Sequence, residues 1–228
     1  MKFLVIIPAR GGSKGIPNKN IIDVCGKPLI QYTIDSALKL KESKLVERVI
    51  VSTDCHKIAD ISESLGAEIP FLRPSSISND SSKTIDSIIH ALSHYEKLGF
   101  FYDAVIILQP TSPLRNYEDL MNSLDFFIAQ PCDSLISAYK EETINRLIMY
   151  HKNGDIAHPL DKNHNVGVRR QEHDSVYIRN GAIYITKTDY IKKSNKIIAT
   201  TPLLFEMSKT NSINIDSYSD LEYLRNFL

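Results

Sequence analysis

The sequence predicts an α/β fold, an open and mostly parallel sheet flanked by helices. Short apolar runs recur along the chain, and segments with apolar residues at helical spacing stand between them. The first apolar run, at 2–7, is nearly continuous, as is typical of a central parallel strand. A length of 228 residues, 43% of them hydrophobic, suits one well-buried domain, so we expect a single domain over 1–228.

The first half of the chain alternates between predicted strands and helices. After the strand at 2–7, a short extended segment at 21–24 leads into a helix with Pro28 in its first turn. The further predicted strands are 46–52, 68–72 and 104–108, and the further helices are 56–65, 84–98 and 117–129. Ser82 and Thr84 are candidate caps for the second of these helices.

The second half contains an interruption. After a strand at 134–138, apolar density drops over 139–178 and four histidines accumulate without the spacing of a zinc site, so we expect an insertion outside the sheet. The remaining predicted elements are strands at 182–186 and 197–199, a helix at 188–193, extended segments at 203–207 and 212–215, and a last helix that begins near Ser219-Asp220 and ends near 227.

Composition excludes several classes of partner. The formal net charge is +0, which argues against a nucleic-acid partner and against binding to an anionic membrane surface. We find no apolar run of membrane-spanning length, and the run at 2–7 is too short for a signal-peptide core. The three cysteines, Cys25, Cys55 and Cys132, lack metal-like pairing and predict buried thiols in a reducing cytoplasm.

A glycine-rich cationic loop directly follows the first strand. Three glycines, at positions 11, 12 and 15, allow backbone N–H groups such as those of Gly12 and Ser13 to approach a ligand closely. No acidic residue lies between Arg10 and Asn20, and the positive charges are those of Arg10, Lys14 and Lys19. This combination suits a polyphosphate, although it matches neither the Walker loop nor G-x-G-x-x-G. The alternative is a solvated basic loop.

Three further polar segments follow predicted strands. They are Thr53-Asp54, Arg73-Pro74 and the segment Gln109–Arg115, which reads Gln-Pro-Thr-Ser-Pro-Leu-Arg. In open α/β sheets ligands bind beyond the carboxyl ends of the strands, so these segments and the cationic loop are expected to meet at one edge. Two prolines stiffen the third segment, which carries an amide, two hydroxyls and a guanidinium. A simple proline-bounded turn is the alternative for it.

The motifs taken together resemble the acylneuraminate cytidylyltransferases, the CMP-sugar synthetases that activate nine-carbon acidic sugars. The resemblance is carried, in chain order, by Ile6–Asn20, Arg73-Pro74 with Asp80 soon after, Gln109–Arg115, Asn180–Ile185 and, in part, Ile213–Ser217. It covers nearly the whole chain and implies a Rossmann-like nucleotidyltransferase sheet. The implied reaction joins CTP and a nonulosonic acid to give a CMP-sugar and pyrophosphate, with the anomeric hydroxyl of the sugar as nucleophile.

The resemblance also implies roles for individual residues. Arg10 and Lys19 would act in catalysis by holding the triphosphate, with Lys14 nearby, and Arg73 would contact the cytosine. The implied nucleotide-binding set is Arg10, Gly12, Ser13, Lys14, Lys19, Asn20, Arg73, Ser82 and Thr84. The implied sugar-binding set is Gln109, Arg170 and Tyr184, with Asn180 in a supporting role. Without the resemblance, Asn180-Gly181 would suit the tip of a hairpin. The general base stays open between Asp54, Asp80 and a metal-bound water.

A magnesium site is expected near the end of the chain. Mg²⁺ prefers one or two carboxylates together with phosphate oxygens and water. The family usually has two aspartates separated by one residue here, and a strand would place both on one face. This chain has Asn214 and Asp216, so we expect Asp216 as the ligand and Asn214 as its partner. The alternative is a strand-end turn that caps the last helix.

The resemblance leaves the substrate and the assembly partly open. It implies that 139–178 is a dimerisation element, and hence a homodimer. The segment 169–171 and the residues Ile197 and Ile198 lie where the sugar pocket is shaped, and they leave sialic, legionaminic and pseudaminic acids as options. The alternatives are a 3-deoxy-manno-octulosonate cytidylyltransferase and a non-catalytic nucleotide-binding subunit.

Overall fold

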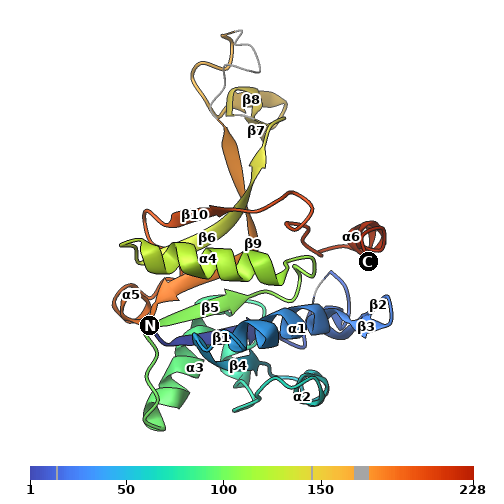
Figure 1. Cartoon of the computed structure of the whole chain (residues 1–228). Coiled ribbons are helices and arrows are strands. Elements are labelled where there is room, and N and C mark those ends of the chain that lie inside the picture. Colours follow the sequence, from blue (N-terminus) through green and yellow to red (C-terminus); the bar gives the residue numbers. More distant parts are fainter. Residues whose placement is uncertain (14, 145, 167–174) are drawn as a thin grey trace.

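A six-stranded mixed sheet forms the centre of the molecule in the computed structural model, which describes residues 1–13, 15–144, 146–166 and 175–228 (Figure 1). The strand order is β10-β6-β9-β5-β1-β4. The strands are β1 (Phe3–Pro8), β4 (Val46–Ser52), β5 (Ala104–Leu108), β6 (Ser134–Glu141), β9 (Val176–Lys187) and β10 (Leu203–Glu206). All neighbours pair in parallel except β9, which is antiparallel to both β5 and β6. The predicted open, mostly parallel α/β fold is confirmed.

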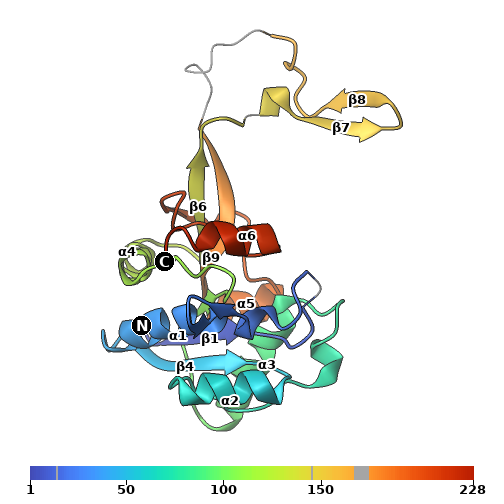
Figure 2. The same cartoon turned by 90° about the vertical axis from the view of Figure 1, so that its right-hand side faces the viewer.

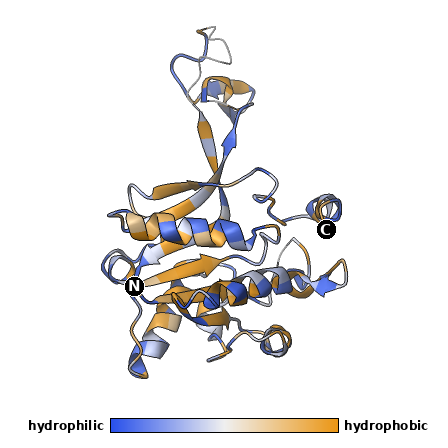
Figure 3. Cartoon of the chain, viewed as in Figure 1, coloured by the Kyte–Doolittle hydropathy of each residue, from blue (hydrophilic) through white to orange (hydrophobic). Residues whose placement is uncertain are grey.

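Helices cover both faces of the sheet, as the alternation of side chains along β1 illustrates. Phe3, Val5 and Ile7 point into a core formed with α1 (Leu29–Lys41), α2 (His56–Ser64) and α4 (Tyr117–Ala129). Leu4 and Ile6 point into a second core with α3 (Thr84–Lys97) and α5 (Thr188–Ser194). Since β1 is buried on both faces, its sequence is continuously apolar rather than alternating. The same is true of β5, the uniformly orange arrow in Figure 3.

Two predicted strands are absent from the described structure. The segment 68–72 contributes only isolated parallel bridges, Ile50 to Glu68 and Thr53 to Leu72, because Pro70 lacks the N–H group that a continuous ladder needs. The segment 197–199 follows α5 as irregular chain held by side chains, with the Thr186 hydroxyl donating to the carbonyl of Ile197 (2.6 Å). The edge strand is instead β10, within the segment predicted only as extended.

Helix caps also differ from those predicted. Lys83, not Ser82 or Thr84, is the N-cap of α3, and its N–H donates to Asp86 Oδ2 (2.9 Å). Pro28 precedes α1 as its N-cap. The last helix, α6 (Tyr218–Leu224), begins after Ser217, whose backbone N–H donates to Asp220 (2.7 Å), and it ends before 227. Among the described residues, no helix is long and apolar enough to cross a membrane.

The insertion begins as a continuation of the sheet. β6 and β9 extend past the body as a two-stranded arm, in which Tyr139 pairs with Ile178 and Glu141 with Val176 (Figures 1 and 2). The strands therefore continue into both ends of the segment 139–178, as far as Glu141 in β6 and from Val176 in β9. Beyond them lie a 3₁₀ turn, Arg146–Ile148, and the hairpin of β7 (Tyr150–Asn153) and β8 (Ile156–Pro159). Every residue of these two strands is exposed.

An ion pair fastens the base of the arm to the C-terminal part of the chain. Glu141 accepts hydrogen bonds from the backbone N–H of Thr143 (2.8 Å) and from Lys209 Nζ (2.9 Å). Hydrogen bonding from Thr143 and Lys209 lowers the pKa of Glu141 to about 2. The arm thus leaves the body from a fixed point.

Candidate active site

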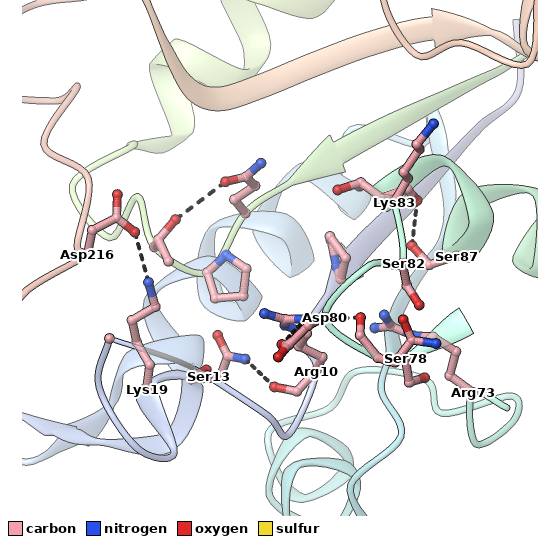
Figure 4. Close-up of a pocket in the computed structure, with 18 residues that line it drawn as sticks. Arg10, Ser13, Lys19, Arg73, Ser78, Asp80, Ser82, Lys83, Ser87 and Asp216 are labelled. Carbon is pink, nitrogen blue, oxygen red and sulfur yellow. Dashed lines mark hydrogen bonds and ion pairs between the residues drawn. The ribbon is translucent and has the colours of Figure 1, made fainter. Parts of the chain in front are cut away.

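A pocket of about 450 Å³ opens at the carboxyl ends of β1, β4 and β5 (Figure 4). It is lined by residues from five separate stretches of the chain: Pro8, Arg10, Ser13, Gly15, Lys19, Asn20, Arg73, Ser78, Asn79, Asp80, Ser82, Lys83, Thr84, Ser87, Gln109, Pro110, Thr111 and Asp216. The cationic loop, Arg73 and the start of the Gln109–Arg115 segment therefore meet at one sheet edge as expected, whereas Thr53, Asp54 and Pro74 do not line the pocket. Of the predicted site residues, Gly12, Tyr184 and Asn214 do not line the pocket, and Lys14 and Arg170, like the segment 169–171, lie outside the described residues.

Contacts within the protein fix the course of the cationic loop. Asp54, directly after β4, accepts a hydrogen bond from the N–H of Gly11 (2.9 Å). Gly11 has no room for a side chain, since a Cβ there would lie 2.9 Å from Cβ of Cys55. The buried amide of Asn20 donates to the carbonyl oxygen of Arg10 (3.0 Å) and so closes the loop on itself. Asn20 acts at least as a brace of the loop.

The two described cations of the loop are each paired with a carboxylate. Arg10 Nη1 lies 3.2 Å from Asp80 Oδ1 and donates to the carbonyl of Asn79 (3.1 Å). Lys19 Nζ lies 2.9 Å from Asp216 Oδ1 and donates to the carbonyl of Ile215 (2.8 Å). Figure 4 shows these two pairs in different parts of the pocket. A bound polyphosphate would compete with both carboxylates for these cations.

The C-terminal segment reaches the pocket because Gly15 lets it approach. A Cβ at Gly15 would lie only 2.6 Å from the carbonyl oxygen of Asp216. The Asp216 side chain is 71% exposed and accepts a further hydrogen bond from the amide of Asn214. The described residues contain no cluster of three or more potential His, Cys, Asp or Glu ligands. Asp216 and Asn214 together fit Mg²⁺ only where phosphate oxygens and water supply most of the ligands of the ion.

The opposite wall of the pocket carries Arg73 and the start of α3. The Arg73 guanidinium is buried and donates to the carbonyl of Ser52, while its backbone N–H donates to that of Thr53 (2.7 Å). Burial lowers its pKa, and the nearby charge of Asp54 opposes that shift. The Ser82 hydroxyl is buried and has no hydrogen-bond partner within the described ranges, as expected of a group that faces a ligand.

Four lining residues lie outside both the predicted site residues and the segments that carry the resemblance: Ser78, Asn79, Lys83 and Ser87. One signal was available for Ser87, because Thr84 and Ser87 are three residues apart on a helix whose apolar residues, such as Ile85 and Ile88, face the core. The Ser87 hydroxyl donates to the carbonyl of Thr84 (2.7 Å). The other three lie in a loop or at a cap, where no periodicity indicates which way a side chain points.

The Gln109–Arg115 segment divides into a pocket-facing part and a buried brace. Gln109 and Thr111 line the pocket. Arg115 is only 2% exposed, and its guanidinium donates to the carbonyl of Ala182 (2.9 Å) and the hydroxyl of Thr33 (2.9 Å). Burial lowers the pKa of Arg115 to about 9. Its guanidinium therefore connects β9 and α1 instead of facing the pocket.

Replacing Arg115 with methionine is expected to lower the free energy of unfolding by about 1–3 kcal/mol, because the carbonyl of Ala182 loses its donor in a buried position. Chemical denaturation measures the change. Arg225→Met, at an exposed arginine that follows α6, serves as the control and should leave stability nearly unchanged. Equal stability of the two variants would contradict the bracing role.

Tyr184 lies behind Gln109. It is only 6% exposed and packs in the second core, and burial raises its pKa. A Cβ at Gly181 would lie 3.5 Å from Gln109 Oε1 and 3.7 Å from the Tyr184 hydroxyl, so both side chains reach toward this glycine. Gly181 has a φ of +75°, which glycine adopts readily. Ile197 and Ile198 pack on the same core.

Comparison with known proteins identifies the family. A family model described as "Cytidylyltransferase" matches residues 4–227. The chain belongs to the cytidylyltransferases. The chain is 32% identical to pseudaminic acid cytidylyltransferase of Campylobacter jejuni over 99% of this chain and 95% of that protein. It is 33% identical to CMP-N,N'-diacetyllegionaminic acid synthase of Legionella pneumophila over 96% and 93% of the two chains.

The comparisons also include a longer relative and a solved structure with the same fold. N-acylneuraminate cytidylyltransferase of Escherichia coli is 32% identical over 97% of this chain, which spans 51% of that longer protein. A CMP:2-keto-3-deoxy-manno-octonic acid synthetase solved in complex with CTP has the same fold, with a TM-score of 0.73 and 19% identity over 100% of this cytidylyltransferase and 98% of that chain. The predicted family is thus confirmed.

Proposed function

We propose that this chain transfers CMP from CTP to the anomeric hydroxyl of a nine-carbon acidic sugar and releases pyrophosphate. The observation that carries the proposal is the convergence of Arg10, Lys19 and Asp216 with Arg73 and Ser82 around one pocket. The first three suit a metal-bound triphosphate, and the last two suit a polar base. Family membership supports the cytidylyl group as the one transferred.

In the proposed reaction the sugar hydroxyl attacks the α-phosphorus of CTP. A new phosphorus–oxygen bond forms to the sugar, the bond to the β-phosphate oxygen breaks, and the hydroxyl proton passes to a base. Arg10 and Lys19 neutralise the charge that accumulates on the departing pyrophosphate. Arg73, Ser82 and Thr84 hold the cytosine. No nucleophile from the protein is required.

The proposed acceptor is a nonulosonic acid of the sialic, legionaminic or pseudaminic type. Relatives named for these acids are 32–33% identical to this chain, whereas the octonic acid synthetase is 19% identical and supports the fold alone. Gln109, Tyr184 and Arg170 are the proposed sugar-binding residues. Ile197 and Ile198 are proposed to shape the acyl side of the sugar pocket.

Magnesium is the proposed cofactor. Asp216 would hold it, with Asn214 as partner and with phosphate oxygens completing its ligands. When bound, the ion would withdraw charge from the triphosphate. Asp216 is then expected to exchange its present partner, Lys19, for the ion, which leaves the Lys19 ammonium for the phosphates.

The test of the function is pyrophosphate release from CTP and Mg²⁺ with a panel of acids: N-acetylneuraminic, legionaminic, pseudaminic and 3-deoxy-octulosonic acid. Turnover with a nine-carbon acid is the expected result. Turnover with the eight-carbon acid alone would replace the proposal with the octulosonate alternative. CTP binding without turnover on any acid would identify a non-catalytic nucleotide-binding subunit.

We also propose a homodimer that forms through the turn and hairpin beyond the arm, in a cytoplasmic protein with three free thiols, of which Cys25 is exposed and not buried as predicted. Apolar side chains on the turn and hairpin beyond the arm are exposed well away from the body, including Ile148 (60%), Tyr150 (47%) and Ile156 (65%) (Figure 2). We expect light scattering to give the mass of a dimer, and Ile156→Asp to shift it toward that of a monomer. A wild-type monomer at working concentration would overturn this part of the proposal.

A further inference from the structure

A buried asparagine joins the sheet to the C-terminal segment. Asn180 lies inside β9 and is only 8% exposed, so the hairpin tip considered from the sequence is wrong. Its Oδ1 accepts from the Ser137 hydroxyl (2.6 Å) and from the N–H of Ala182 (3.0 Å). Its Nδ2 donates to the Ser212 hydroxyl (2.8 Å) and to Sδ of Met207 (3.3 Å). Both polar atoms of the side chain are used within the protein.

On the sheet side, these bonds stabilise an irregularity. The pairing of β6 with β9 shifts register between Ile136 and Ala138, opposite residues 180–183 of β9. The Ser137 hydroxyl bridges the gap by also accepting from the N–H of Ile183 (2.8 Å). The irregularity places Gly181 beside the side chains of Gln109 and Tyr184. Because glycine has no side chain, these two side chains have room to approach the backbone there. Asn180 therefore shapes the wall behind Gln109.

On the other side, the bonds hold the segment 207–216, here called the tail. The Ser212 hydroxyl, which accepts from Asn180, donates in turn to the carbonyl of Ser208 (2.7 Å). The tail is attached again where the N–H of Ile215 donates to the carbonyl of Thr111 (2.8 Å). The next residue is Asp216, the partner of Lys19. The bonds of Asn180 are thus one of several attachments that hold the tail, together with those of Lys209 to Glu141 (2.9 Å) and Asn211 to Asp119 (2.9 Å).

We propose that Asn180 is a positioning residue that fixes the Gln109 wall and the Asp216 tail relative to each other. It lies behind the pocket and is absent from its lining, so it acts through its neighbours. The inference rests on the proposed function, because it assigns the wall to the sugar and the tail to the triphosphate. Asn180 would then set the distance between the two substrates.

The sharpest test is Ser212→Ala, which removes the hydroxyl between Asn180 and the carbonyl of Ser208 and leaves the bonds of Asn180 to Ser137, Ala182 and Met207 in place. We expect kcat to fall about tenfold or more, since small misplacements of catalytic groups are costly, with KM for the acid within about twofold of wild type. Asn180→Ala removes both links and should also raise that KM. Ser208→Ala is the matched control, because its side chain bonds only within the tail, to the N–H of Asn211 (3.0 Å).

Hydrogen exchange supplies a readout that needs no turnover. The N–H of Ile215 should exchange faster in Ser212→Ala than in wild type, while that of Ile183, which bonds to Ser137, should not change. Lower melting temperatures with unchanged exchange at Ile215 and unchanged kcat would make Asn180 a purely structural residue. Changed exchange in a protein without turnover would support the coupling and count against the proposed function.

Discussion

Replacing Lys19 with methionine is expected to lower kcat/KM for CTP by about 10²–10³-fold, the usual cost of removing one preorganised group that stabilises transition-state charge. Methionine keeps the length and the apolar stem of lysine and removes only the ammonium. The Lys19 side chain is 15% exposed, so water replaces the lost charge poorly. Pyrophosphate release measures the change, and most of it should appear in kcat, because the charge on pyrophosphate develops as it leaves.

The control for this variant is Lys27→Met. Lys27 is an exposed lysine on β3 (Lys27–Pro28), its Nζ lies 3.5 Å from Asp35, and it does not line the pocket. Its substitution should leave kcat/KM within about twofold of wild type, as is usual for exposed ion pairs. Wild-type kcat/KM for Lys19→Met would remove Lys19 from the proposed catalytic pair.

A double variant tests the role of the Lys19–Asp216 contact more strictly. Residues in direct contact rarely have additive effects. If Asp216 holds Lys19 in place before CTP binds, Lys19→Met combined with Asp216→Ala should lose less activity than the sum of the two single losses. Strict additivity would mean that the 2.9 Å ion pair has no part in the reaction cycle.

Local pattern was enough to predict where the pocket lies. The strand at 3–8, the glycines and the cations of the loop are adjacent in sequence, and the rule that ligands bind at strand ends brought Arg73 and Gln109 to the same edge. Helix and strand boundaries at 104–108 and 117–129 agree with the structure because apolar periodicity marks them clearly.

Partners of individual side chains were beyond sequence reasoning. Nothing near Arg115 in the chain indicates that its guanidinium turns inward to Ala182 and Thr33, because that contact depends on how β9 and α1 pack. The same holds for Lys19, whose partner Asp216 is 197 residues away. The strand predicted at 68–72 failed for a local reason, since Pro70 interrupts a pattern that otherwise suits a strand.

Replacing Asp216 with alanine is expected to abolish Mg²⁺-dependent turnover, a loss of roughly 10³-fold or more, while the fold stays intact. Asp216 is the only acidic residue of the tail, so its carboxylate is the only one that the tail can provide for the proposed ion. Alanine offers no ligand to Mg²⁺ and leaves the Lys19 ammonium without its ion-pair partner. Since the side chain is 71% exposed, and the close contact with Gly15 involves only its backbone oxygen, the melting temperature should change little. Full activity of Asp216→Ala would remove Asp216 from the metal site.

Asn214→Asp tests the same site from the other direction. It restores the pair of carboxylates that the family usually has, and more carboxylates raise the affinity of a site for Mg²⁺. In the structure the Asn214 amide donates a hydrogen bond to Asp216. The variant replaces this bond with a repulsion between two carboxylates, which a bound cation relieves. We therefore expect a lower Mg²⁺ concentration for half-maximal activity and, without Mg²⁺, a lower melting temperature than wild type. An unchanged Mg²⁺ requirement would place the ion away from the tail.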